Sequence, residues 1–147
     1  MLNHELIEDR LAQIRISANR LKKMESISLE SFTFDPDHYA IAEHHLRKML
    51  ESVFDIGRHI IAKKGLGKPA NYSQIIELLG QQKIITPEFS QSIKGMAGYR
   101  NRLVHEYAKI TPEEVFNIIK TRLNDFAQFC TFIVQFLERE NNNVPFN

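Results

Sequence analysis

The sequence of 147 residues predicts an all-α fold. Apolar residues recur every three or four positions in nearly every segment, which is the spacing of one face of an α-helix. No run alternates between apolar and polar residues with the two-residue period of a half-buried strand. Proline, glycine and capping residues divide this helical pattern into segments. We therefore expect an antiparallel four-helix bundle with one short additional helix.

The first half of the sequence predicts two long helices. The first covers about residues 3–25, and a connection over 27–34 follows. Asp35 can cap the second helix, which begins with Pro36, because proline is tolerated where no backbone donor is needed. This helix ends near Gly65. The apolar stripes of the two helices are Ile7, Leu11, Ile14, Ala18 and Leu21, and Ala42, Leu46, Met49, Val53, Ile56 and Ile60.

The second half predicts one short helix and two longer ones. Asn71 and Gln74 resemble a capping pair that opens a short helix over about 72–83. Thr86 and Pro87 begin the fourth helix, and Thr111 begins the last one with the pattern of a full capping box. The last helix presents one seam of Phe116, Ile119, Leu123, Phe126, Cys130, Ile133 and Leu137. We expect a single domain over residues 1–140 and a flexible tail over 141–147.

Composition restricts the class of protein only in part. Nineteen Lys and Arg against eighteen Asp and Glu give a formal charge of +1, which argues neither for nor against binding to RNA. The single Cys130 lies in an apolar stripe, so we interpret it as a core residue in a reducing compartment. The sequence shows neither a secretory signal nor an apolar run of the ~20 residues needed to cross a bilayer. We expect a cytoplasmic protein without membrane contact.

The fourth helix carries an arginine on its apolar seam. The seam consists of Phe89, Ile93, Met96, position 100, Leu103 and Tyr107. A guanidinium there needs partners for its charge, unless the seam faces a wet groove or another subunit at that point. One interpretation is a structural salt bridge between Arg100 and Asp55 of the second long helix. Gly95 and Gly98 predict a bend or a close backbone approach just before Arg100.

His105 follows Arg100, and together they suggest a chemistry. A histidine can remove the proton of an RNA 2′-hydroxyl or protonate the leaving 5′-oxygen, and an arginine can stabilise the charge that develops on phosphorus. Asn101 lies one turn before His105, where its amide could orient the imidazole or hold a phosphate oxygen. On a straight helix Arg100 and His105 point in different directions. Using both on one phosphate requires a helix distortion or a second subunit. The alternative is that His105 is an ordinary surface residue.

The segment Tyr99–Tyr107 resembles the signature of the HEPN superfamily, in particular of its HepT-like branch of toxin ribonucleases. In that signature an arginine, four residues, a histidine, any residue and a tyrosine occur in this order. Further segments resemble the same branch, and the resemblance covers most of residues 5–137. These segments are Asp35–Tyr39, Asp55–Ile60, Leu66–Pro69 before Tyr72, and Thr111–Glu113.

The resemblance implies a homodimer, or a higher oligomer in complex with a partner, whose motif-bearing helices meet to form a composite endoribonuclease site. Arg100 and His105 would be catalytic and Asn101 supporting, and we count Asp55 as supporting through its pairing with Arg100. In the type VII toxin–antitoxin systems of this family, a nucleotidyltransferase antitoxin of the MNT type transfers AMP to the tyrosine that corresponds to Tyr107. We therefore expect RNA as substrate, such an antitoxin as partner, and neither a metal nor a cofactor.

Two other functions remain open at this point. The chain could be a non-catalytic helical partner that holds a nucleotide or substrate for a separate nucleotidyltransferase, or a purely structural dimerising bundle. Neither function requires a paired arginine and histidine, which favours the ribonuclease. Growth arrest on expression in a bacterium, relieved by a neighbouring nucleotidyltransferase gene, would indicate the toxin. No effect in either case would indicate the binding partner.

Overall fold

The structure is a computed structural model that describes residues 1–105 and 110–142. Within those ranges it contains eight helices and no strand, which confirms the predicted all-α class. The helices are α1 (His4–Lys22), α2 (Leu29–Phe34), α3 (Pro36–Lys64), α4 (Tyr72–Gln81), α5 (Pro87–Ser92), α6 (Met96–Val104), α7 (Pro112–Thr121) and α8 (Leu123–Asn142).

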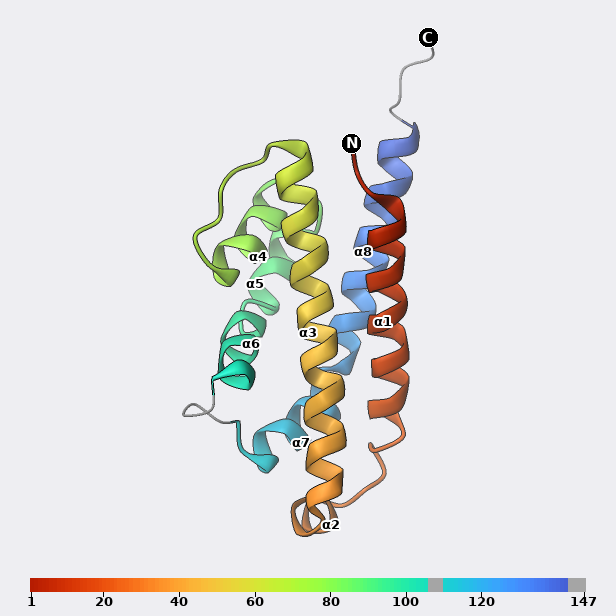
Figure 1. Cartoon of the computed structure of the whole chain (residues 1–147), viewed down its shortest axis with the longest axis vertical. Coiled ribbons are helices and arrows are strands. Elements are labelled where there is room, and N and C mark those ends of the chain that lie inside the picture. The colour runs from red at the N-terminus through yellow and green to blue at the C-terminus, as the bar shows by residue number, and fades with distance from the viewer. Residues whose placement is uncertain (106–109, 143–147) are drawn as a thin grey trace.

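The longest helix, α3, organises the molecule. It packs along α1, and α1 also contacts α8, which runs behind these two helices in Figure 1. The other side of α3 is covered by α4, α5 and α6, which follow one another along it, while α2 and α7 close one end (Figure 1). The core between these helices is strongly apolar, with Phe32, Phe54 and Phe129 almost fully buried. Cys130 is also buried, and its burial raises the pKa of the thiol to about 11.

The predicted helix starts are confirmed where a capping side chain marks them. The Asp35 carboxylate accepts a hydrogen bond from the backbone N–H of Asp37, directly before the first turn of α3. Asn71 accepts from the N–H of Gln74 at the start of α4, and Thr111 forms the expected capping box at the start of α7. At the other end of α3, Gly65 has φ +63°, a left-handed conformation that glycine adopts without steric cost. Capping is local, and therefore readable from sequence.

The helices differ from the prediction in four places. The connection predicted over 27–34 contains α2, whose six residues are too few to show a helical period. The predicted fourth helix is divided into α5 and α6 by a turn at residues 93–95, where the glycines predicted a bend. The predicted last helix is divided at Arg122, which has φ −123° and ψ 0°. Helix α8 then runs to Asn142, past the predicted start of the tail.

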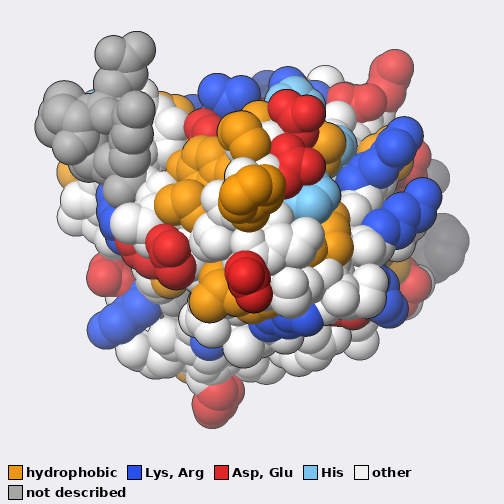
Figure 2. All heavy atoms as spheres, turned by 90° about the horizontal axis from the view of Figure 1, so that it is seen from below, with side chains coloured by type: hydrophobic (Ala, Val, Ile, Leu, Met, Phe, Trp, Pro, Cys, Tyr) orange, Lys and Arg blue, Asp and Glu red, His pale blue; other side chains and the backbone are white. Residues whose placement is uncertain are grey.

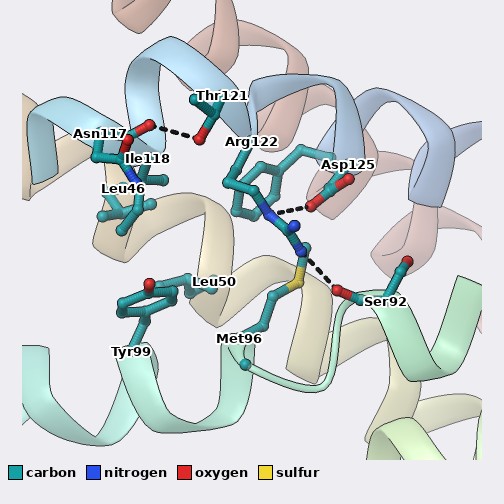
Figure 3. Close-up of a pocket in the computed structure, with 12 residues that line it drawn as sticks. Leu46, Leu50, Ser92, Met96, Tyr99, Asn117, Ile118, Thr121, Arg122 and Asp125 are labelled. Carbon is teal, nitrogen blue, oxygen red and sulfur yellow. Dashed lines mark hydrogen bonds and ion pairs between the residues drawn. The ribbon is translucent and has the colours of Figure 1, made fainter. Parts of the chain in front are cut away.

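The breaks in the last two predicted helices face each other. The Arg122 guanidinium donates a hydrogen bond to the backbone carbonyl of Ser92, at 2.5 Å, and forms an ion pair with Asp125 at 2.8 Å. Figure 3 shows Arg122 between these two partners. The helix break thus places a cation where it binds the free carbonyl at the end of α5. The apolar periodicity of the sequence continues through both helix breaks, so it does not predict the contact between Arg122 and Ser92.

One end of the molecule exposes apolar side chains. Phe34 is 89% exposed, and Leu29 and Ile41 are 43% and 49% exposed. Seen from this end, an apolar patch lies in the middle of the surface with acidic side chains beside it (Figure 2). In the part of the chain that the structure describes, no helix is both long and apolar enough to cross a membrane.

Candidate active site

The motif segment lies across the end of α6 rather than within a helix. Arg100 is in the helix, whereas His105 follows the last helical residue and has φ −100° and ψ 115°, an extended conformation. The His105 N–H still bonds to the carbonyl of Asn101, at 3.2 Å. His105 therefore lies one turn after Asn101, although it is not itself part of the helix.

Arg100 does not form the salt bridge with Asp55 that was expected. The Asp55 carboxylate instead accepts a hydrogen bond at 2.9 Å from Nε of Arg10 on α1. Asp55 lies on the face of α3 toward α1, while its neighbour Phe54 contacts Tyr72 of α4. Asp55 thus supports the packing of α1 on α3 and not Arg100. The prediction failed because sequence spacing does not tell which neighbour a polar residue on a central helix will meet.

The partner of Arg100 is an aromatic ring. Its Cζ lies 4.2 Å from the centroid of the Tyr72 ring, the geometry of a cation–π interaction. The Nε atom of Arg100 is buried and has no hydrogen-bond partner within the described ranges. A second arginine, Arg58 of α3, has its Cζ 5.4 Å from the centroid of the same ring. Three helices therefore bring two guanidinium groups to one tyrosine.

His105 lies in different surroundings. It lines a cavity of about 170 Å³ together with Tyr39 and Glu43 of α3, the last turn of α6, and Ile110. Arg100 does not line this cavity, and its guanidinium lies on the Tyr72 ring instead. The structure of one chain therefore does not bring Arg100 and His105 into one cavity.

Side chains hold the end of α6 and the start of α7 in place. Arg102 donates two hydrogen bonds to the carboxylate of Glu114 on α7, at 2.6 and 2.8 Å. The hydrogen bond with Arg102 is the main cause that lowers the pKa of Glu114, to about 2. Tyr39 donates a hydrogen bond to the carbonyl of Ile110, at 2.7 Å. These contacts tie the end of α6 and the start of α7 to each other and to α3.

Tyr107, the expected acceptor of AMP, and Glu106, which the i,i+4 spacing would pair with Arg102, both lie outside the described ranges. The structure adds Glu114 as a partner of Arg102, which the sequence identified only as a capping residue.

Sequence reasoning also missed Tyr72, Arg58, Tyr39 and Glu43. Each lies on a helix distant in sequence from the motif, so spacing alone could not connect it to Arg100 or His105. The available signal was that Tyr39 and Arg58 fall in segments that resemble the HepT-like branch, and that Tyr72 lies three residues after the end of another such segment.

A larger cavity of about 440 Å³ lies beside the motif helix and contains neither Arg100 nor His105. Leu46, Met96 and Tyr99 form part of its wall, and Arg122 and Asp125 lie at the break between α7 and α8 (Figure 3). Burial raises the pKa of Asp125, and the neighbouring Arg122 opposes this shift. The polar groups of this cavity are mainly engaged in holding the two helix breaks together.

No group of three or more His, Cys, Asp or Glu in the described part of the chain is placed to hold a metal ion.

Comparison with known proteins agrees with the motif. The family model described as "Ribonuclease HepT-like" matches residues 14–133. A "tRNA nuclease HepT" of Aphanizomenon flos-aquae is 37% identical over 141 residues, which cover 93% of this chain and 95% of the relative. An "mRNA nuclease HepT" of Shewanella oneidensis is 34% identical over 89 residues, which cover 60% of this chain and 67% of the relative.

A solved structure gives the same result at the level of the fold. It is a tri-AMPylated HEPN toxin of Shewanella oneidensis in complex with an MNT antitoxin, and it superposes with a TM-score of 0.80 at 28% identity. The match covers 91% of this chain and 99% of the toxin. Fold, motif and sequence similarity over nearly the whole chain therefore agree, and this protein belongs to the HepT-like ribonuclease family of the HEPN superfamily.

Proposed function

We propose that this protein is a toxin endoribonuclease that cleaves RNA without a metal ion, with Arg100 and His105 as its catalytic residues. The observation that carries the proposal is that the Arg100 guanidinium is held in place without a neutralising partner within the described ranges. Its guanidinium is fixed on an aromatic ring, and no carboxylate of the described residues neutralises it. Family membership and the named activities of the HepT relatives supply the substrate class.

The reaction follows from the two side chains. His105 either removes the proton of the 2′-hydroxyl or donates a proton to the leaving 5′-oxygen, and water accepts or supplies the other proton. The 2′-oxygen attacks the adjacent phosphorus, the bond to the 5′-oxygen breaks, and a 2′,3′-cyclic phosphate and a 5′-hydroxyl result. Arg100 donates hydrogen bonds to the phosphoryl oxygens as negative charge builds up on them. Asn101, which is exposed on α6, supports the site by binding a phosphate oxygen. DNA lacks the 2′-hydroxyl and is not cleaved.

The separation of the two catalytic residues within one chain supports a homodimeric site. Helix α6 contacts α3 and α4 and lies at the side of the molecule (Figure 1). Gly98, Asn101 and Val104 are exposed at successive turns of α6, and an added Cβ at Gly98 would meet nothing within 4 Å. A glycine on an exposed face allows the backbone of a second helix to approach closely. A second copy seated there would bring its own motif segment next to Arg100 of the first.

The proposed control of the toxin is AMPylation of Tyr107 by an MNT-type nucleotidyltransferase antitoxin. The structural relative from Shewanella oneidensis is AMPylated and bound to such an antitoxin. Tyr107 follows His105 by two residues in sequence, so a phosphodiester on its hydroxyl would bring negative charge close to the place proposed for the RNA phosphate. Like charges and steric bulk would then keep the substrate away.

We expect the purified protein to cleave RNA in the presence of EDTA and to leave 2′,3′-cyclic phosphate ends. A DNA oligonucleotide of the same sequence should remain intact, and so should an RNA with a 2′-O-methyl group at the cleavage site. Denaturing gels and mass spectrometry of the fragments measure both cleavage and end groups. Activity that disappears with EDTA and returns with a divalent cation, or equal cleavage of the methylated RNA, would contradict the proposed chemistry.

A further inference from the structure

The ring of Tyr72 lies where α3, α4 and α6 meet, and packing fixes its position. It is the first residue of α4, directly after the capping residue Asn71. The ring of Phe54 packs against the Tyr72 ring at 4.9 Å, with an angle of 66° between the planes. Gly57 allows α3 and α4 to approach closely, since a Cβ there would come within 2.7 Å of Ile75. The position of the Tyr72 ring is therefore determined by packing from α3 and by the cap of α4.

The two arginines that contact the Tyr72 ring, Arg58 and Arg100, are not neutralised by a carboxylate of the described residues. Arg10, Arg102 and Arg122 each form an ion pair with a carboxylate. Within residues 1–105 and 110–142, Arg58 and Arg100 have no such partner, and their contacts are with the ring of Tyr72. A cation–π interaction orients a guanidinium without placing a negative charge beside it. Its donors can then bind a phosphate, for which the planar fork of arginine is well suited.

There is space for a ligand beside the ring. Arg58 and Tyr72 line an open cavity of about 380 Å³, together with Pro69, Ala70, Asn71 and Ile75. Arg58 is exposed, so its guanidinium can reach a ligand that lies along this surface. In contrast, the Nε of Arg100 is buried, which limits the orientations that its side chain can take.

We propose that Arg58, Tyr72 and Arg100 form one binding site for the backbone of single-stranded RNA. Tyr72 acts as a positioning residue that holds the Arg100 guanidinium toward the scissile phosphate, while Arg58 binds a neighbouring phosphate of the same strand. This inference rests on the proposed ribonuclease function, and it names residues outside the motif that this function requires. The two roles predict different kinetic effects. Loss of positioning lowers kcat, whereas loss of a contact to a flanking phosphate raises KM.

The test is steady-state cleavage of a short RNA by the full-length protein and four variants. Tyr72→Leu should lower kcat about tenfold, in line with the usual strength of a partly desolvated cation–π contact. Tyr72→Phe, which keeps the ring, should retain a kcat near that of the wild type. Arg58→Ala should raise KM about fivefold and reduce the salt dependence of binding by about one phosphate contact. Arg15→Ala is the matched control, because Arg15 is an exposed arginine of α1 beside α8.

A double-mutant cycle separates positioning from general stability. In a protein that already carries Arg100→Ala, Tyr72→Leu should cause no further loss of the residual cleavage. The inference is overturned if Tyr72→Leu keeps the wild-type kcat, if the losses multiply in the double variant, or if Arg58→Ala behaves like Arg15→Ala. If Tyr72→Leu fails to fold, the KM of Arg58→Ala still tests the proposed site, since this variant changes only an exposed side chain. Wild-type protein that cleaves no RNA would overturn the proposed function as well.

Discussion

Replacing His105 with alanine is expected to abolish RNA cleavage, with a loss of at least about a hundredfold in kcat, the usual range for a general acid or base. Arg100→Ala should cause a loss of similar size, because it removes donors to the charge that develops on phosphorus. The folded structure should be retained in His105→Ala, since His105 is exposed and follows the end of α6. Initial rates on a labelled RNA measure the loss, and thermal unfolding measures the stability.

His4→Ala is the matched control for this variant. His4 is an exposed histidine at the start of α1, in a cavity formed with α8. Its replacement should leave the cleavage rate unchanged. Cleavage by His105→Ala at the rate of the His4→Ala control would remove His105 from the mechanism and favour a binding partner without catalysis.

Replacing Tyr107 with phenylalanine is expected to make the toxin insensitive to its antitoxin. Wild-type toxin incubated with the MNT-type antitoxin and ATP should gain one or more adenylyl groups and lose its cleavage activity, because the added phosphate repels the RNA backbone. Tyr107→Phe offers no hydroxyl to the transferase and should remain active. Intact-protein mass spectrometry and the cleavage assay, performed on the same samples, give the two results together.

Tyr99→Phe serves as the control for the modification. Tyr99 belongs to the same motif segment but lies in α6 and lines the large cavity beside it. This variant should still be AMPylated and silenced. AMP found on Tyr107→Phe at the wild-type level, or silencing of that variant without modification, would show that another residue or simple binding controls the toxin.

The sequence predicted those parts of the fold that depend on local chemistry. The starts of α3, α4 and α7 follow from Asp35, Asn71 and Thr111, because a capping side chain acts on backbone groups of its own first turn. The division of the last helix at Arg122 could not be predicted in this way. It depends on a contact with Ser92, thirty residues away in sequence, and the apolar seam continues across it.

The site shows the same division between local and distant information. Arg100 could be singled out because an arginine on an apolar seam conflicts with the helical pattern. Its actual partner, Tyr72, could not be found from spacing, since the contact depends on how α4 and α6 pack on α3. Asp55 was assigned to Arg100 on the wrong face of α3, where Arg10 of α1 binds it instead. The sequence did not predict that α6 would end directly before His105.

We propose that each catalytic site takes Arg100 from one copy of the chain and His105 from another. Mixing equal amounts of Arg100→Ala and His105→Ala protein, after unfolding and refolding together, tests this claim directly. Half of the dimers would then be mixed, and one of the two sites in each mixed dimer would be complete. We predict recovery of about a quarter of the wild-type cleavage rate, within the additivity expected of independent sites. A mixture that stays as inactive as the separate variants, although size measurements show mixed dimers, would contradict the account.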